Sequence, residues 1–135
     1  YSNNLTYDEI ISPRHINTDH VRYEQHRVWK LEANLKPSTR HVYSRRVFYQ
    51  DEDTWGIVST ELYDARGELW RVQEQYPIVF YDVPVCGASM GGAYDFTNGR
   101  YVLVGMINEE EPINFYASEL NEDRYTPQTI RTIGR

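Results

Sequence analysis

Apolar and polar residues alternate with a period of two over much of the chain between residues 26 and 104. The segment "HRVWKLEANLK" (26–36) shows this well, because Trp29 and Leu31 are apolar while Lys30 and Glu32 are charged. A period of two places successive side chains on opposite faces of a strand. The segment therefore predicts a half-buried strand whose odd-numbered residues face a core.

Five more segments have the composition of strands separated by short turns. They are "HVYSRRVFYQ" (41–50), "WGIVSTELY" (55–63), "ELWRVQEQYPIVFY" (68–81), "MGGAYDF" (90–96) and "RYVLVGMI" (100–107). Proline cannot donate a hydrogen bond to a strand ladder, so Pro77 predicts a bulge or an edge within the fourth strand. The segment "DVPVCGAS" (82–89) is predicted to be a loop.

Two turns have specific signals. Asn98-Gly99 is the dipeptide that most readily adopts a type I′ hairpin turn, so it predicts that turn between the last two strands. In "YDARGELWR" (63–71), Asp64 suits the first position of a type I turn and Gly67 the following left-handed position. We therefore expect Gly67 to have a positive φ, and we interpret this charged cluster as a turn rather than an active site.

Short helices are predicted near both ends of the chain. Thr6 and Glu9 have the spacing of a capping box, which predicts a single helical turn. Thr126 is a suitable N-cap and Pro127 suits the first helical position, so a helix is expected over about residues 127–133. Together the elements predict a mainly β domain spanning residues 1–135: a curled antiparallel meander, or incomplete barrel, with one or two short helices.

Composition excludes some classes of function. The net charge of −6 argues against nucleic-acid binding, which needs a concentrated basic face. No apolar run approaches the roughly 20 residues that cross a bilayer as a helix, so a membrane-spanning protein is not expected. Cys86 is the single cysteine, which leaves no intramolecular disulfide, and its neighbours lack basic residues, which predicts a buried or inert thiol.

The residues suited to catalysis or metal binding do not form a recognisable set. Zinc needs three or four converging ligands, and the spacing of "HINTDH" (15–20) does not match a helical face. Loop histidines that bond to the backbone are the better interpretation, and a hydrolase that uses His15, Asp19, His20 or His26 is the least favoured hypothesis. The acidic run "NEEEP" (108–112) is interpreted as solvated. We therefore predict no enzyme, no catalytic residue, no metal and no cofactor.

Aromatic side chains are the remaining candidates for a site. Three tryptophans and several tyrosines are distributed over the predicted strands. Such side chains fill a core, or they line the concave face of a curled sheet that holds an apolar ligand, and the sequence alone leaves both alternatives open. For the second alternative, the predicted ligand-binding residues are Trp29, Leu31, Trp70, Tyr76 and Phe80.

Three motifs carry a resemblance to a known family. They are "HxNxDxVRYExHRVW", "LKPxxRHxYxxRVFYxDEDxW" and "YDxRGxLWRV". Their combination resembles the C-terminal part of the bacterial family catalogued as domain of unknown function 1329, which is labelled outer-membrane lipoprotein-sorting-like and is similar to LolA/LolB-type carriers. The resemblance implies an incomplete barrel with helices at its open side, and a periplasmic or outer-membrane location in Gram-negative bacteria. It also implies a fragment of a longer secreted precursor, lacking the N-terminal half.

These observations lead to two hypotheses. The first is a non-enzymatic periplasmic carrier or accessory protein that binds a lipid or acyl group on the concave face of the sheet. The alternative is a protein-interaction module that docks onto an outer-membrane or transporter partner. Neither involves nucleic acid.

Overall fold

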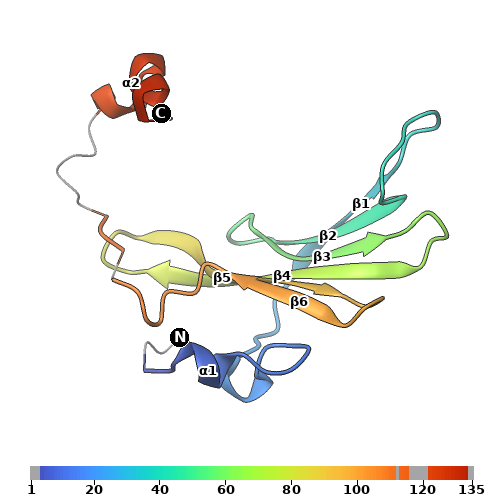
Figure 1. Cartoon of the computed structure of the whole chain (residues 1–135), viewed down its shortest axis with the longest axis horizontal. Helices are drawn as coiled ribbons and strands as arrows, with labels where there is room; N and C mark the ends of the chain where they lie inside the picture. The colour runs from blue at the N-terminus through green and yellow to red at the C-terminus, as the bar shows by residue number, and fades with distance from the viewer. Residues whose placement is uncertain (1–3, 112, 116–121, 134–135) are drawn as a thin grey trace.

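The computed structural model describes residues 4–111, 113–115 and 122–133, and its main feature is one six-stranded antiparallel sheet (Figure 1). The strands are β1 (Val28–Asn34), β2 (Arg45–Asp51), β3 (Ile57–Tyr63), β4 (Leu69–Phe80), β5 (Val85–Asp95) and β6 (Arg100–Val104). They follow one another in chain order across the sheet, with β1 and β6 at its edges. The predicted meander is confirmed, and the sheet is not closed into a barrel.

The described residues also form four short helical segments: α1 (Tyr7–Ile10), η1 (Thr18–His20), η2 (Glu122–Tyr125) and α2 (Pro127–Ile133). The capping box is confirmed, because the carboxylate of Glu9 accepts a 2.8 Å hydrogen bond from the backbone N–H of Thr6. The C-terminal helix is also confirmed, with Thr126 Oγ1 accepting from the N–H of Thr129 at 3.3 Å. This helix packs against η2 and is drawn apart from the sheet in Figure 1. No helix in the described ranges is long and apolar enough to cross a membrane.

The strand register separates the side chains into two faces. Directly opposed residues of antiparallel strands point to the same side. One side carries Leu31 and its partner Phe48, and we name it the open face. The other carries Val47 and, on β5, Tyr94; we name it the covered face, because the N-terminal segment (residues 4–27) lies against it.

The core lies between the N-terminal segment and the covered face. Ile10 and Ile16 are buried against Met90 of β5. Partly buried apolar side chains surround them: Leu5, Val21, Tyr76, Tyr94, Leu103 and Met106. The Tyr101 hydroxyl fastens the segment by donating a 2.6 Å hydrogen bond to the backbone carbonyl of Ser12. The core is thus completed by a segment with almost no regular structure, on the face opposite to Trp29 and Leu31.

The turn around Gly67 agrees with the sequence. Gly67 has a φ of 81°, its N–H donates to the carbonyl of Asp64 at 3.0 Å, and the N–H of Asp64 donates to the carbonyl of Glu68 at 3.0 Å. This is the predicted three-residue hairpin. Arg66 forms ion pairs with Asp64 and Glu68 at the surface, at 3.1 and 2.8 Å. The charges therefore decorate a turn.

Other local predictions are wrong. Asn98-Gly99 does not form a type I′ turn, because only Gly99 has a positive φ; a four-residue loop closes instead, with the Gly99 N–H donating to the Asp95 carbonyl. The segment 82–89 is not all loop, since β5 begins at Val85 and pairs with the end of β4. Cys86 accordingly lies in a strand and is exposed, so of the two predicted alternatives, a buried or an inert thiol, burial is wrong.

The predicted irregularity at Pro77 is confirmed as a register shift between Tyr76 and Pro77.

Strand β1 exists as predicted, but its expected half-burial is wrong, because Trp29 is 57% and Leu31 46% exposed. Both lie on an edge strand and on the open face, away from the N-terminal segment.

Candidate functional site

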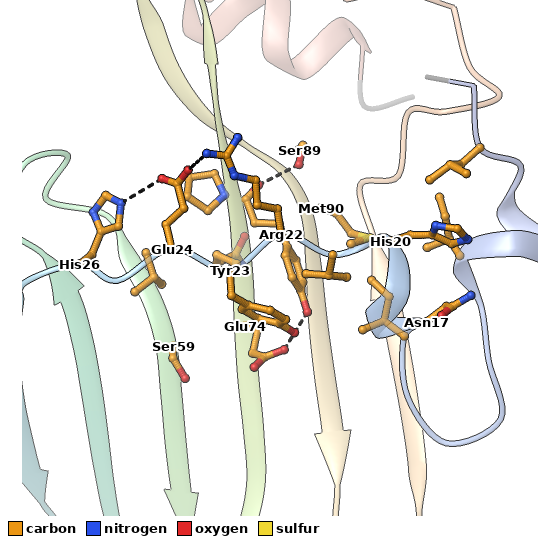
Figure 2. A pocket seen from close by; sticks show the side chains of 18 of the residues that line it. Asn17, His20, Arg22, Tyr23, Glu24, His26, Ser59, Glu74, Ser89 and Met90 are labelled. Atoms are coloured by element: carbon orange, nitrogen blue, oxygen red, sulfur yellow. Dashed lines mark hydrogen bonds and ion pairs between the residues drawn. The ribbon is translucent and has the colours of Figure 1, made fainter. Parts of the chain in front are cut away.

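A cavity of about 520 Å³ lies between the N-terminal segment and the covered face of β3–β5 (Figure 2). Its size falls within the range of roughly 300–1,000 Å³ found for ligand pockets. Apolar lining comes from both sides: Leu5, Ile10, Ile16, Val21, Tyr23, Val58, Tyr76, Pro77 and Met90. Polar lining comes from the segment, from strands β2–β5 and from the region after β6: Asn17, His20, Arg22, Glu24, His26, Asp51, Ser59, Glu74, Gln75, Ser89 and Asn108.

The sheet side of the cavity is built around Tyr76. Its hydroxyl donates a 2.7 Å hydrogen bond to the carboxylate of Glu74, two residues earlier on β4. Burial is the main cause that raises the pKa of Tyr76 far above its usual value, so the hydroxyl stays protonated and remains a donor. Ser89 donates to the carbonyl of Tyr76 at 2.8 Å, which stabilises the irregular pairing beside Pro77. On this side of the cavity the polar groups of Tyr76, Glu74 and Ser89 are therefore held in place by hydrogen bonds within the protein.

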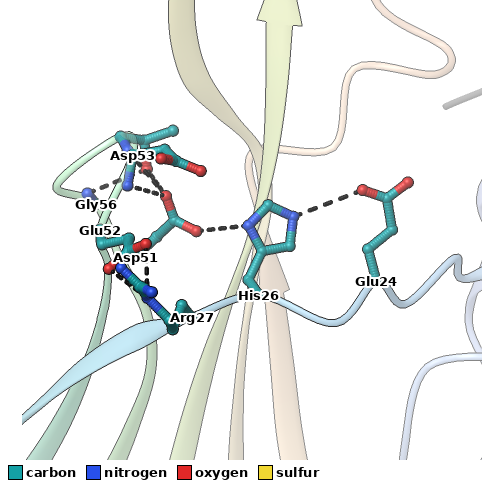
Figure 3. A network of polar contacts seen from close by, with 8 residues as sticks. Glu24, His26, Arg27, Asp51, Glu52, Asp53 and Gly56 are labelled. Atoms are coloured by element: carbon teal, nitrogen blue, oxygen red, sulfur yellow. Dashed lines mark hydrogen bonds and ion pairs between the residues drawn. The ribbon is translucent and has the colours of Figure 1, made fainter.

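The outer side of the cavity is a strap, residues 21–27, which has no regular secondary structure and crosses the strands (Figure 2). Within the strap, Arg22 forms an ion pair with Glu24, and Glu24 lies 3.6 Å from Nε2 of His26. At its end, Nδ1 of His26 lies 2.8 Å from a carboxylate oxygen of Asp51, the last residue of β2 (Figure 3). The His26–Asp51 pair therefore fastens the strap to the sheet.

Asp51 also organises the turn between β2 and β3 (Figure 3). Its Oδ1 accepts hydrogen bonds from the N–H groups of Asp53 and Thr54, at 3.0 and 2.8 Å, and from the Thr54 hydroxyl at 3.0 Å. The backbone bond from Thr54 is the largest cause that lowers the pKa of Asp51. The hydrogen bond with Asp51 is the largest cause that raises the pKa of His26. Each partner therefore favours the charged form of the other.

Three potential metal ligands converge at the same place. His26, Asp51 and Asp53 offer three ligand atoms within 4.8 Å of one another. However, Asp51 already accepts three hydrogen bonds through Oδ1 and contacts His26 through Oδ2. Both carboxylate oxygens of Asp51 therefore already have partners within the protein, which favours a structural role for the His26–Asp51 pair over metal binding. His15 behaves as expected for a loop histidine, with Nδ1 bonded to the carbonyl of Ile16 at 2.6 Å.

The predicted ligand-binding residues do not come together around one cavity. Trp29 and Leu31 lie on the open face, and Trp70 lies beside that face, its Nε1 donating to Asp95 at 3.1 Å. Tyr76 and Phe80, four residues apart on β4, point to the covered side, and Phe80 packs against Phe115 with ring centroids 5.0 Å apart. Of the five, Tyr76 alone lines the cavity.

Sequence reasoning missed the other side of the cavity. Ile10, Ile16 and Val21 lie in a segment without periodicity, so no pattern marked them as core residues. The one usable signal was the capping box at Thr6 and Glu9, which showed that this segment is ordered.

Comparisons with known proteins give a family but no established activity. The chain is 44% identical over 130 residues to "Uncharacterized protein PA3922" of Pseudomonas aeruginosa, an alignment that covers 96% of this chain and 29% of the relative. The chain thus spans less than a third of that relative. A solved DUF1329 family protein from Desulfovibrio piger is 17% identical, with 56% of this chain and 31% of that chain covered and a TM-score of 0.48.

A solved putative outer membrane lipoprotein-sorting protein domain from Vibrio parahaemolyticus is 15% identical, with 77% of this chain and 42% of that chain covered and a TM-score of 0.46. The family model described as "Protein of unknown function (DUF1329)" matches residues 1–131. The resemblance carried by the three motifs is therefore confirmed, and the chain belongs to the DUF1329 family.

Proposed function

We propose that this domain is a non-enzymatic carrier or accessory protein that binds a lipid or acyl group in the cavity beneath the strap. The cavity itself is the observation that supports the proposal. It is large enough for a small ligand, and its inner part is formed by Ile10, Ile16, Val21 and Met90. The proposed location is the periplasm or the outer-membrane surface of a Gram-negative bacterium.

The energetics suit an apolar ligand. Each methylene group removed from water contributes roughly 0.8 kcal/mol, so a long acyl chain binds without a charged anchor. Several polar groups at the cavity already have partners within the protein, as in the Glu74–Tyr76 and His26–Asp51 pairs. Such pairs orient the walls of a pocket, whereas a catalytic base needs access to its substrate.

The strap gives a route for entry. It has no strand or helix to hold it, and its charged side chains lie partly in solvent. Its fastening to the sheet near β2 consists of the His26–Asp51 contact, the Arg27–Glu52 ion pair at 2.8 Å, and a backbone bond between Glu52 and Arg27. Segments with few buried contacts open at low free-energy cost. Movement of the strap would admit a ligand without unfolding the sheet.

The first test is extraction of the purified full-length protein with organic solvent, followed by mass spectrometry for bound lipid. We expect a co-purified lipid, or uptake of added fatty acid by protein that is empty. Val21→Trp fills the cavity from the strap and should abolish uptake into the cavity. Val42→Trp, at an exposed position outside the cavity, is the matched control. Empty extracts together with no uptake of added fatty acid would exclude the proposal.

A further inference from the structure

The open face of the sheet has an unusual distribution of charge for an acidic chain. Register partners in one transverse row are Ala33, Arg46, Leu62, Arg71, Asp95 and Arg100. Because opposed residues share a face, three arginines project from the open face of this row against one aspartate. The chain as a whole has a net charge of −6, so this row departs from the average composition. We call it the arginine row.

The single aspartate is already occupied. Asp95 accepts hydrogen bonds from the Thr97 hydroxyl at 2.6 Å, from Nε of Arg71 at 2.9 Å and from Nε1 of Trp70 at 3.1 Å. Arg71 also donates to the Tyr43 hydroxyl at 2.9 Å. Asp95 and Arg71 thus form a closed pair, which leaves the other two arginines of the row uncompensated.

Of these two arginines, Arg46 has the more apolar surroundings and is the better candidate to bind an anion. No ion pair to Arg46 or Arg100 occurs within the part of the chain that the structure describes. The register neighbours of Arg46 are Ala33, which is small, and Leu62, which is buried. Apolar surroundings strengthen the attraction between a guanidinium and an anion. Its Nη2 lies 3.0 Å from Nε2 of His41, and its guanidinium lies 5.4 Å from the ring centre of Tyr43.

Next to Arg46 the open face is apolar. Phe48 follows it on the same face of β2, about 7 Å further along the strand. Leu31 opposes Phe48, and beyond them Trp29 and Ile57 both oppose Gln50. Trp29, Leu31 and Ile57 are 57%, 46% and 44% exposed. Four apolar side chains therefore form a patch whose one end meets an uncompensated arginine.

We propose that this patch and Arg46 bind one anionic amphiphile, with the acyl or alkyl chain over Trp29, Leu31, Phe48 and Ile57 and the phosphate or carboxylate head on Arg46. The arrangement of charge decides the class of ligand. A neutral lipid leaves the guanidinium without a partner, whereas a free anion leaves the apolar patch in water. Arg100 adds positive potential along the same row, whereas the charge of Arg71 is balanced by Asp95. This site lies on the opposite face from the cavity and does not depend on it.

The test is isothermal titration calorimetry of the full-length protein with four probes: dodecyl phosphate, dodecanoate, dodecyl maltoside and inorganic phosphate, the amphiphiles below their micelle concentrations. We expect either or both anionic amphiphiles to bind about tenfold or more tightly than the maltoside, because a charge-assisted hydrogen bond contributes at least that much. Inorganic phosphate should bind far more weakly than dodecyl phosphate. The comparison of the two anionic heads shows which one Arg46 prefers.

Variants assign the binding to residues. Arg46→Gln should remove the preference for anionic heads, and Arg46→Lys should retain part of it. The matched control is Arg45→Gln, which removes the same charge from the same strand on the covered face, where Arg45 lies over Tyr63. Leu31→Ser should weaken all three amphiphiles equally. Arg46 has no ion pair among the residues that the structure describes, and Arg45 pairs with the partly exposed Glu32 at 3.6 Å, so melting by circular dichroism should show the arginine variants folded.

Four results would overturn the proposal. They are equal affinity for neutral and anionic amphiphiles, an equal effect of Arg45→Gln and Arg46→Gln, equal binding of inorganic phosphate and dodecyl phosphate, and binding only to vesicles that contain anionic lipid. The last result would identify a bilayer-docking surface instead. The cavity variant Val21→Trp, which no longer admits a ligand to the cavity, should retain the Arg46-dependent binding of the two anionic amphiphiles, so failure here is distinct from failure of the proposed carrier function.

Discussion

Substitution of Gly67 isolates backbone strain from packing. Gly67 has a φ of 81°, in the left-handed region that side chains with a Cβ adopt only at a cost. A Cβ built at Gly67 would meet no atom within 4 Å. The effect of a substitution therefore comes from the backbone conformation and not from a steric clash with a neighbour.

The expected magnitude depends on the shape of the new side chain. Valine is β-branched, and holding it in the left-handed region costs about 1–3 kcal/mol of unfolding free energy. Asparagine tolerates the same region because its short polar side chain bonds locally, so Gly67→Asn should cost clearly less than Gly67→Val. The hairpin should still form in both variants, since the bonds between Asp64 and Glu68 do not involve the side chain of residue 67.

The assay is equilibrium unfolding in urea, monitored by tryptophan fluorescence. We expect the midpoint to fall in the order glycine, asparagine, valine, with the dependence of free energy on urea concentration unchanged. Ligand binding should remain intact in both variants, because the turn lies at neither proposed site. The reasoning is refuted if Gly67→Val is as stable as the native protein, or if asparagine costs as much as valine.

Three further predictions concern stability and access. Because the pKa of His26 is raised in the folded protein, protonated His26 stabilises the fold fully below its unfolded-state pKa near 6.5, and this stabilisation is lost as pH rises through the folded-state pKa. Because the pKa of Asp51 is lowered, ionised Asp51 stabilises the fold above its unfolded-state pKa of about 3.9, and this stabilisation is lost on acidification. The stability difference between the native protein and His26→Gln should therefore be largest between about pH 4 and 6.5 in urea titrations, and a difference that grows above pH 8 would contradict it. Val47→Ala, at a fully buried position, should lower the unfolding free energy by about 2 kcal/mol in the same assay, and a neutral effect would contradict its burial. Cys86 should react with a maleimide in the native state, as measured by intact mass, because its strand leaves it exposed; protection until denaturation would refute this placement.

The elements of the fold were predictable because their signals are local. The alternation around Trp29 and Leu31 marks a strand without reference to any other part of the chain. The same is true of the turn at Gly67, where one position requires a left-handed conformation. At Asn98-Gly99 the local signal predicts a two-residue turn, but the side chain of Asp95 accepts the N–H of Thr97 and supports a longer loop.

The site was not predictable to the same degree, because faces depend on register. Each bulge changes which residues share a face, and shifts occur beside Gln50, Tyr63 and Pro77. Trp29 and Tyr76 fit the same alternating pattern yet lie on opposite faces. The contact between His26 and Asp51 joins positions 25 residues apart, and no local sequence pattern predicts it.

Uptake of a neutral long-chain alcohol such as dodecanol, measured by equilibrium dialysis against the full-length protein, tests the carrier proposal most directly. A neutral probe has no head for Arg46 and so reports on the cavity. We predict saturable binding that Val21→Trp abolishes and that Val42→Trp and Arg46→Gln leave intact. Absence of binding to the native protein, or undiminished binding to Val21→Trp, would contradict the proposal that the cavity beneath the strap holds an apolar ligand.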